Sequence, residues 1–307
     1  MTHFLDLKDF TKPQLRAMLN GAAKRKKTRA NLSKGTVDQD LPLKGKAIAL
    51  VFERPSTRTR FSFEMAIRQL GGEVFSITGA EMQLGRGESI ADTARVVSRY
   101  VDCIMLRAKE QDTLQEFAAA ATIPVINGLT NRTHPTQVLA DVLTLEEHKG
   151  EIDGKRIAWV GDGNNVCASW IEAVGVLGGS LKIASPESLR PRPEFMNWAT
   201  QNKADVEVLT SPEMAVVHAD CVVTDAWLSM HDDDHENRHN LLRPYQVNAA
   251  LMKLAAPAAQ FMHCLPAHRN EEVTDEIMDG KHSVVFDEAE NRLHAQKAIL
   301  LNCFGKF

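Results

Sequence analysis

Short apolar runs and longer amphipathic stretches alternate along the chain. The run from Ala47 to Phe52 is entirely apolar, which is typical of a strand buried on both faces of a sheet. The next segment places Phe63, Ile67 and Leu70 at i, i+4 and i+7, which predicts a helix closed by Gly71-Gly72. This alternation indicates βα units that build a parallel sheet.

Two series of such units follow each other. In the first, the remaining strands are expected at residues 74–77, 103–106 and 124–126, with a helix marked by the apolar positions between 90 and 101. In the second, strands are expected at residues 156–160, 180–184, 206–209, 221–224 and 260–263. A helix from Thr136 to His148 is expected to link the series, and a last helix to run from about Glu288 to Leu301. The pattern therefore predicts two doubly wound parallel-sheet α/β domains.

Length and composition agree with two soluble domains. The chain has 307 residues, of which 44% are hydrophobic and 25% charged, so it can bury two cores. The net charge is −4, and we expect the cations to be spread along the chain rather than gathered on one predicted helix, which disfavours a nucleic-acid partner. No apolar run is long enough to span a membrane, and the start MTHFLDLKDF lacks a signal peptide's apolar stretch. We expect no membrane association and a cytoplasmic location.

The cysteines form neither a disulfide framework nor a structural zinc site. Their number is odd and their spacing wide, with no C-x-x-C pair; they are Cys103, Cys167, Cys221, Cys264 and Cys303. Most are expected to be small buried hydrophobes, and only Cys264 has suggestive neighbours. The polar segment HDDDHENRHN, residues 231–240, has three histidines, but their loose spacing favours a solvated loop over a metal site.

A dense group of phosphate-type donors follows the first strand. In open α/β sheets ligands bind beyond the carboxyl ends of the strands, so segments in this position are candidate sites. Arg54-Pro55-Ser56-Thr57-Arg58-Thr59-Arg60 leads from the strand into a helix, whose first amides and dipole favour an anion. Ser56, Thr57 and Thr59 add hydroxyl donors, and Arg58 and Arg60 can bind phosphate bidentately. A capped helix with solvated arginines is the plainer alternative.

Two further candidates follow later strands of the first series. Arg107 comes directly after an expected strand, where it is either a solvated strand end or a ligand contact. His134-Pro135-Thr136-Gln137 forms a turn whose proline starts the linking helix. His134 can donate to a carbonyl oxygen and Gln137 can accept from an amide nitrogen, although a histidine before proline is often only a helix cap.

The glycine-containing turn of the second series does not form a dinucleotide site. Gly161-Asp162-Gly163-Asn164-Asn165 follows a strand, but a G-x-G-x-x-G motif would need glycine where Val166 stands. The next strand ends in Ala184-Ser185 instead of the acidic residue that binds a ribose. A nicotinamide-dependent enzyme is therefore disfavoured.

Several of these motifs together resemble the aspartate and ornithine carbamoyltransferase family. Ser56-Thr57-Arg58-Thr59-Arg60 resembles the family's carbamoyl-phosphate signature, and H-P-x-Q at His134 is also the family's pattern. Asp225-Ala226-Trp227-Leu228-Ser229-Met230 and His263-Cys264-Leu265-Pro266 resemble the ornithine-specific members. The resemblance covers nearly the whole chain and extends to Arg292 in the last helix.

The resemblance implies a carbamoyl-phosphate domain at residues 1–148, to which a C-terminal helix of about 288–307 returns, and an ornithine domain at residues 152–287. The implied catalytic residues are Arg58, Arg107, His134, Asp225 and Cys264. The implied carbamoyl-phosphate contacts are Ser56, Thr57, Arg58, Thr59, Gln83, Arg107, His134, Gln137, Cys264, Leu265 and Arg292. The implied ornithine contacts are Asn165, Asp225, Ser229 and Met230.

The implied reaction transfers the carbamoyl group of carbamoyl phosphate to the δ-amine of L-ornithine, giving L-citrulline for arginine metabolism. It requires no metal and no organic cofactor. The family forms a homotrimer or multiples of trimers, in which the loop with Gln83 reaches a neighbouring subunit's site. One departure is that His231 follows Met230 where the family commonly has glycine, which is expected to stiffen the loop.

Three alternatives stay open at this point. Another amine, such as aspartate, putrescine or an acylated ornithine, could replace ornithine, although Asp225 and the H-C-L-P motif argue against these. A non-catalytic relative could keep the fold as a binding subunit, but the phosphate-site residues are complete. The biosynthetic and reverse directions use the same residues and are not distinguished.

Overall fold

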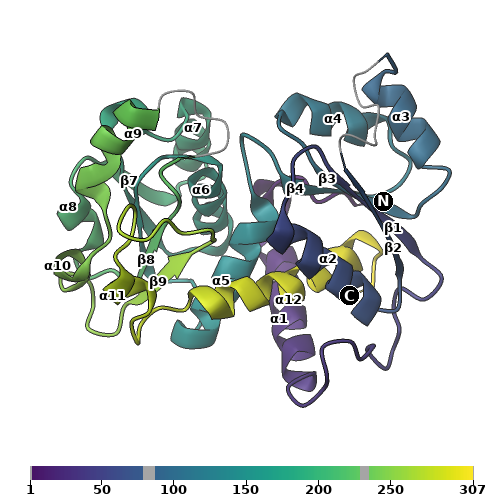
Figure 1. The fold of residues 1–307 in the computed structure, drawn as a ribbon, viewed down its shortest axis with the longest axis horizontal. Coiled ribbons are helices and arrows are strands. Elements are labelled where there is room, and N and C mark those ends of the chain that lie inside the picture. Colours follow the sequence, from purple (N-terminus) through teal and green to yellow (C-terminus); the bar gives the residue numbers. More distant parts are fainter. Residues whose placement is uncertain (1, 79–86, 229–234, 307) are drawn as a thin grey trace. The chain divides into compact units, whose positions relative to one another are not determined.

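The computed structural model describes residues 2–78, 87–228 and 235–306, which form two compact units (Figure 1). Unit 1 comprises residues 1–140 and 290–307, and unit 2 comprises residues 141–289. The division falls within two helices, α5 (Pro135–Lys149) and α12 (Val285–Cys303). The C-terminal helix therefore returns the chain to the first unit, as the resemblance to the family implied.

Unit 1 is built on a parallel sheet of four strands in the order β2-β1-β3-β4. The strands are β1 (Ala47–Phe52), β2 (Glu73–Thr78), β3 (Cys103–Arg107) and β4 (Val125–Leu129). Phe4 forms a parallel bridge with Ile126, so the N-terminal segment extends the sheet beside β4. From β1 the chain continues to β2 on one side of the sheet, and it then crosses to β3 on the other side of β1. The strand order therefore reverses between β1 and β3, and open parallel sheets bind their ligands at such a point.

The helices of unit 1 are α1 (Lys12–Thr28), α2 (Thr57–Gln69), α3 (Ile90–Val97) and α4 (Gln111–Ala120), with a short 3-10 turn at Leu7–Asp9. Ala94 of α3 and Leu114 and Phe117 of α4 pack against Val51 and Leu106 of the sheet, so α3 and α4 cover one of its faces (Figure 1). α2 buries Phe63 and Ile67, two of the apolar positions that predicted this helix.

Unit 2 is built on a parallel sheet of five strands in the order β7-β6-β5-β8-β9. The strands are β5 (Arg156–Val160), β6 (Ser180–Ala184), β7 (Asp205–Leu209), β8 (Cys221–Thr224) and β9 (Gln260–His263). Here the order reverses between β5 and β8, so the segments that follow these two strands are the expected ligand region.

The main helices of unit 2 are α6 (Asn165–Leu177), α7 (Pro193–Gln201), α8 (Pro212–Val216), α9 (His235–Leu242), α10 (Ala249–Met252) and α11 (Asp275–Met278). Two 3-10 turns lie at Glu187–Leu189 and Arg243–Tyr245. Val216 of α8 and Leu251 of α10 pack with Val160, Val222 and Phe261 of the sheet into one apolar cluster. These short helices therefore cover one face of the sheet.

The predicted two-domain parallel α/β fold is confirmed, and two local expectations are wrong. The segment 231–240, expected as a loop, contains the start of α9 from His235. The cations are also less evenly spread than expected, because Lys24, Arg25, Lys26 and Lys27 are consecutive near the end of α1. Arg25 points inward to Asp38 at 3.0 Å, so part of this charge is neutralised within the unit.

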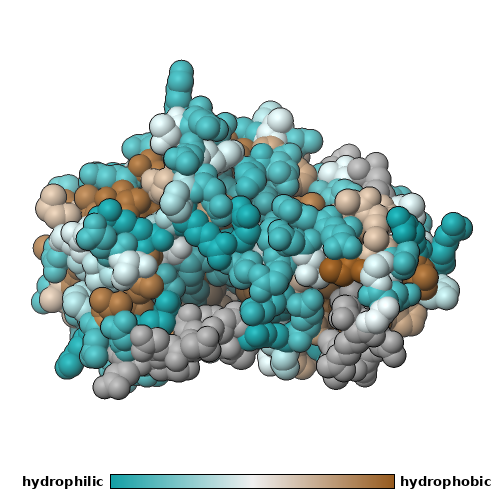
Figure 2. All heavy atoms as spheres, turned by 90° about the horizontal axis from the view of Figure 1, so that it is seen from above, coloured by the Kyte–Doolittle hydropathy of each residue, from teal (hydrophilic) through white to brown (hydrophobic). Residues whose placement is uncertain are grey.

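The described helices include none that is long and apolar enough to cross a membrane. On the face seen in Figure 2, hydrophilic residues predominate and apolar residues form small separate patches. Scattered apolar surface of this kind is normal for a globular protein.

Candidate functional site

In unit 1, the segment after β1 forms the N-terminus of α2 and lies at the point where the strand order reverses. Ser56 is the N-cap residue, with extended backbone angles of φ −153° and ψ 101°, but its side chain makes no capping hydrogen bond. The amides of the first turn are therefore not satisfied by the cap. This leaves a set of donors, together with the helix dipole, that favours an anion at residues 56–59.

Thr59 connects this helix to two arginines. Its side chain is fully buried, and its Oγ1 accepts a hydrogen bond of 2.6 Å from Nη2 of Arg292 in α12. Arg107, the last residue of β3, lies with Nη1 3.5 Å from the same oxygen. The sheet places Arg107 directly opposite Phe52 at the end of β1. The structure thus brings together Thr59, Arg107 and Arg292, which are far apart in sequence.

Arg58 and Arg60 differ in their surroundings. Nε of Arg60 donates to Glu64 at 2.9 Å, and Glu64 also accepts from the hydroxyl of Ser76 at 2.6 Å. Arg60 is therefore held on the exposed side of α2. Arg58 is half-buried, and within the described part of the chain its guanidinium has no hydrogen bond. Of the two arginines suggested by the sequence, Arg58 keeps all of its guanidinium donors available, whereas Nε of Arg60 is used by Glu64.

His134 and Gln137 lie at the start of α5 and are both buried. The preceding loop is anchored by Thr133, which accepts from Asn127 at 3.0 Å and donates to Asp6 at 2.5 Å. Burial and the neighbouring guanidinium groups of Arg292 and Arg107 hold the pKa of His134 well below its usual value. Its imidazole is therefore neutral at physiological pH, and one ring nitrogen can donate a hydrogen bond while the other accepts.

In unit 2, Asp225 lies directly after β8 and is held by three donors. Nδ2 of Asn164 donates to Oδ2 at 2.7 Å, while Oδ1 accepts from the Ala226 amide at 2.8 Å and from the Cys264 thiol at 3.1 Å. These groups come from segments that follow β5, β8 and β9. The carboxyl ends of three strands thus fix one carboxylate.

The Cys264 side chain is a protonated thiol that serves as a hydrogen-bond donor. Burial and the carboxylates of Asp225 and Glu288 raise the pKa of Cys264 well above its usual value. A protonated thiol is consistent with its donation to Asp225. Cys103, Cys167, Cys221 and Cys303 are free and buried, as the sequence predicted for the cysteines outside the site.

A buried pair supports the turn after β9. Nδ1 of His263 accepts a hydrogen bond of 2.9 Å from the Leu265 amide, and its Nε2 lies 3.2 Å from Glu272. Both side chains are fully buried. Leu265 has φ +59°, in the left-handed region that non-glycine residues rarely adopt, so this turn requires support from its surroundings. Because Nδ1 accepts, the ring hydrogen of neutral His263 lies on Nε2.

The glycine turn after β5 packs against its own unit. A Cβ atom at position 163 would lie 2.2 Å from the backbone nitrogen of Pro191. Glycine at this position therefore allows two backbone segments of the unit to pack closely, which explains it without a bound pyrophosphate. Asn164 caps α6 by accepting from the amides of Val166 and Cys167 at 2.9 and 3.1 Å. Asn165, the predicted substrate residue, is half-buried at the first position of α6.

Two positioning residues were missed by the sequence reasoning. Asn164 links the α6 cap to Asp225, but the sequence pattern favoured its neighbour Asn165. Arg238 of α9 donates to the Asp162 carboxylate at 2.5 Å and to the Trp227 carbonyl oxygen at 3.3 Å, joining the turn after β5 to the segment after β8. Arg238 was assigned to a solvated loop because the segment 231–240 is very polar. Gln83, Ser229, Met230 and His231 lie outside the described residues.

Asp225, His263 and Cys264 also present possible metal-ligand atoms within 4.8 Å of one another. However, Asp225 and Cys264 bond to each other, and both ring nitrogens of His263 already face partners. The polar atoms of this group are therefore satisfied without an ion.

Two family models together match almost the whole chain. Residues 2–147 match the carbamoyl-P binding domain of aspartate/ornithine carbamoyltransferases, and residues 153–303 match their Asp/Orn binding domain.

Individual proteins match over similar lengths. An ornithine carbamoyltransferase of Nitrobacter winogradskyi is 58% identical over 303 residues, covering 99% of this chain and 97% of its own. A solved ornithine carbamoyltransferase from Pyrococcus furiosus is 45% identical with a TM-score of 0.93, covering 99% of this chain and 97% of that one. An anabolic ornithine carbamoyltransferase from Campylobacter jejuni is 37% identical with a TM-score of 0.92, and both chains are covered completely.

Proposed function

This chain belongs to the aspartate/ornithine carbamoyltransferase family, and we propose that it transfers the carbamoyl group of carbamoyl phosphate to the δ-amine of L-ornithine. The products are L-citrulline and phosphate. The observation that carries the choice of ornithine is the Asp225 carboxylate at the end of β8, which Asn164 and Cys264 hold in place. A carboxylate there favours a cationic amino acid side chain over the carboxylate side chain of aspartate.

The phosphate group of carbamoyl phosphate binds at the N-terminus of α2. Backbone amides of the first turn and the hydroxyl groups of Ser56 and Thr57 donate to its oxygens, and Arg58 supplies a guanidinium group. The uncapped state of this helix end supports the assignment. As the carbon–oxygen bond breaks, these donors stabilise the charge that develops on the departing phosphate.

The carbamoyl oxygen is held by Thr59, Arg107 and His134. The 2.6 Å bond from Arg292 fixes the Thr59 hydroxyl as an acceptor from that arginine, so its own hydrogen can point to the substrate. His134 is neutral and therefore donates one hydrogen bond without placing another cation in the site. Gln137 binds the carbamoyl nitrogen, and the resemblance also assigns Cys264 and Leu265 of unit 2 to carbamoyl-phosphate binding. These donors stabilise the oxyanion that forms on the carbamoyl oxygen during attack.

The ornithine side chain binds with its δ-amine beside Asp225 and Cys264. Asn165, Ser229 and Met230 hold the α-amino and α-carboxylate groups. The protonated δ-amine cannot attack, so it first loses a proton to solvent or through Asp225. Its lone pair then forms the carbon–nitrogen bond, the tetrahedral intermediate expels phosphate, and the nitrogen loses a second proton.

The first domain, residues 1–148 with the returning helix, binds carbamoyl phosphate in this proposal, and residues 152–287 bind ornithine. The assembly in this proposal is a homotrimer or a multiple of trimers, in which Gln83 serves a neighbouring subunit's site. The reaction serves arginine metabolism in the cytoplasm.

An assay of phosphate release with a panel of amines tests the proposed function. Purified protein is given carbamoyl phosphate with ornithine, aspartate, putrescine or an acylated ornithine. Ornithine should give the highest kcat/KM by a wide margin, and citrulline should form in equal amount to phosphate. Arg58→Gly should lose nearly all turnover while keeping wild-type stability, since its guanidinium makes no hydrogen bond within the described residues. Higher activity with another amine would refute the choice of ornithine, and phosphate release without a carbamoylated product would refute the transfer.

A further inference from the structure

A second group of potential ligands lies outside the proposed substrate site, in the turn between β9 and α11. His268, Glu271 and Glu272 each present one ligand atom, and these atoms lie within 4.8 Å of one another. All three residues belong to unit 2. None of them has a role in the proposed carbamoyl transfer.

Glu272 is the unusual member because its carboxylate is fully buried and, within the described part of the chain, only one of its two oxygens takes part in hydrogen bonds. Oε1 faces Nε2 of His263 at 3.2 Å and accepts from the His268 amide at 2.5 Å. Oε2 is equally buried but has no hydrogen-bond partner among the described residues. A buried carboxylate oxygen without a hydrogen bond is costly unless a donor or a cation compensates it, and the nearest group with an ion-pair contact to it is His268, whose Nδ1 lies 3.7 Å away. The orphaned oxygen is therefore independent support for a missing ligand.

The atoms around Oε2 are suited to a metal ion. Nδ1 of His268 lies 3.7 Å from it, and a tetrahedral ion with bonds of about 2.0–2.1 Å separates its ligands by roughly 3.4 Å. The half-exposed Glu271 carboxylate is the third donor, and His239 of α9 lies with Nε2 3.7 Å from Glu271 Oε2. An ion could bind without a large rearrangement.

The backbone that carries these ligands is well anchored. The Glu271 amide donates to the His268 carbonyl at 3.0 Å, and the Asn270 amide donates to Val273 at 2.7 Å. The side chain of Gln246 donates to the carbonyl oxygens of Asn270 and Glu271 at 3.0 and 2.9 Å. Preorganised ligands of this kind lower the cost of binding.

We propose that His268, Glu271 and Glu272 form a binding site for a divalent transition-metal ion. Imidazole and carboxylate ligands, with no thiolate, suit zinc, cobalt, nickel or manganese. His263 would then be an outer partner of the ion, because its ring hydrogen faces the other oxygen of Glu272. Since His263 also accepts from the Leu265 amide, the ion would stabilise the turn after β9.

Cobalt titration with visible absorption spectroscopy tests this site. The protein is prepared without a histidine tag, which would itself bind cobalt. It also carries Cys264→Ser as a background substitution, because a cobalt ion bound by the group of Asp225, His263 and Cys264 would show a thiolate charge-transfer band. This background protein should take up one cobalt ion per chain, with ligand-field bands and no charge-transfer band. Binding to the native state alone should also raise its melting temperature.

Substitutions of two partly exposed ligand residues, together with one matched control variant, test whether cobalt binds at this site. His268→Ala and Glu271→Gln in the same background should each weaken cobalt binding by roughly tenfold or more. His282→Ala, which removes another histidine of unit 2, should leave binding unchanged. Glu272→Gln is avoided as the main test because a change to a fully buried, hydrogen-bonded side chain can unfold the protein. The proposal is wrong if the background protein takes up no cobalt at millimolar concentration, or if His268→Ala binds as tightly as its parent.

Discussion

At the scale of single residues, Cys264 acts as a hydrogen-bond donor to Asp225 rather than as a reactive thiolate. Its raised pKa leaves little thiolate at neutral pH, and thiolate is the nucleophilic form. We therefore predict that iodoacetamide inactivates the enzyme slowly at pH 7 and progressively faster as the pH rises beyond the usual range of a free thiol. Ornithine should protect, because its δ-amine lies beside the thiol in the proposed site.

The matched variant for this prediction is Cys264→Ala, which should raise the KM for ornithine more than that for carbamoyl phosphate and should lose sensitivity to iodoacetamide. Rapid inactivation of the wild type at pH 7, or an alkylated enzyme that keeps full activity, would contradict the proposed role of the thiol.

Asn164 combines a capping and a positioning role, and two substitutions separate them. Asn164→Asp keeps an acceptor for the Val166 and Cys167 amides but replaces the donor to Asp225 with a second carboxylate. We predict that it retains near wild-type stability and raises the KM for ornithine at least tenfold, with little change for carbamoyl phosphate. Asn164→Ala also loses the cap, which costs about 0.5–2 kcal/mol of unfolding free energy. Steady-state kinetics and urea unfolding measure the two effects.

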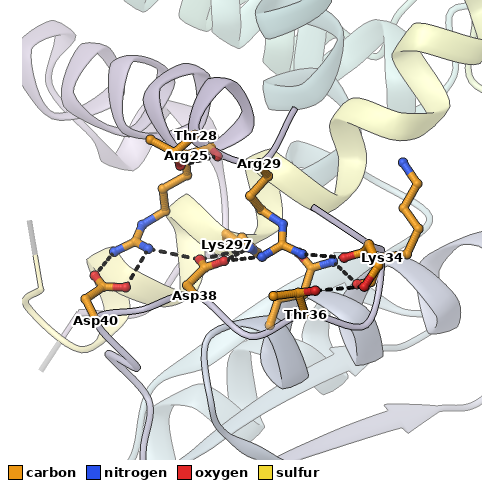
Figure 3. A network of polar contacts seen from close by, with 10 residues as sticks. Arg25, Thr28, Arg29, Lys34, Thr36, Asp38, Asp40 and Lys297 are labelled. Atoms are coloured by element: carbon orange, nitrogen blue, oxygen red, sulfur yellow. Dashed lines mark hydrogen bonds and ion pairs between the residues drawn. The ribbon is translucent and has the colours of Figure 1, made fainter. Parts of the chain in front are cut away.

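At the scale of secondary-structure elements, Asp38 joins α1 and α12 through three cations (Figure 3). It accepts from Arg25 at 3.0 Å, from Arg29 at 2.5 Å and from the buried Lys297 at 2.9 Å. We predict that Asp38→Asn costs about 3–5 kcal/mol of stability, because it leaves buried cations without their shared carboxylate. Asp40→Asn is the control: its side chain is 55% exposed, so the loss should stay below about 1 kcal/mol. Equal midpoints in urea would contradict this.

The same network gives a pH dependence through Lys297. Burial lowers the pKa of Lys297 from 10.5 to about 8, despite its bond to Asp38. Between these values the unfolded chain binds more protons than the folded one, so the contribution of Lys297 to stability becomes more favourable as pH rises. We predict that the stability of wild type relative to Lys297→Met increases from pH 8 to pH 10, as measured by urea unfolding. A constant difference would show that Lys297 does not titrate in this range.

The elements also differ in how well the sequence predicts them. Strands such as Ala47–Phe52 were predicted because continuous apolar runs leave little alternative in a sheet covered on both faces. α9 was not, because its segment is almost wholly polar and its helix depends on contacts of Arg238 with Asp162 and Trp227.

The residues of the candidate site also differ in how far the sequence predicts them. Arg107 lies at the end of β3 and Asp225 directly after β8, so topology identifies both positions as candidates, whereas their roles were taken from the resemblance to the family. The partnership of Glu272 with His263 could not, because it depends on a turn that returns nine residues later in the chain.

At the scale of the whole molecule, the chain divides into two units, each with its own parallel sheet and its own group of candidate ligands beyond the strand ends. Candidate carbamoyl-phosphate residues after β1 and β3 belong to unit 1, and candidate ornithine residues after β5 and β8 belong to unit 2. The proposed reaction joins two substrates, and each unit supplies the candidate residues for one of them, so the reaction needs both units. In the proposed trimer, a neighbouring subunit contributes the loop that carries Gln83.

The shared site of that trimer can be tested by complementation between two inactive variants. Gln83 is proposed to serve a neighbouring subunit, whereas Arg107 lies at the end of β3 and near Thr59 of its own chain. Gln83→Ala and Arg107→Ala proteins should each be nearly inactive alone. In mixed trimers, some sites combine the intact loop of one chain with the intact arginine of the other, so refolding the two variants together should restore a fraction of wild-type activity. Size measurements accompany the assay, because an active monomer, or mixed oligomers that recover nothing, would mean that Gln83 serves its own chain or no site.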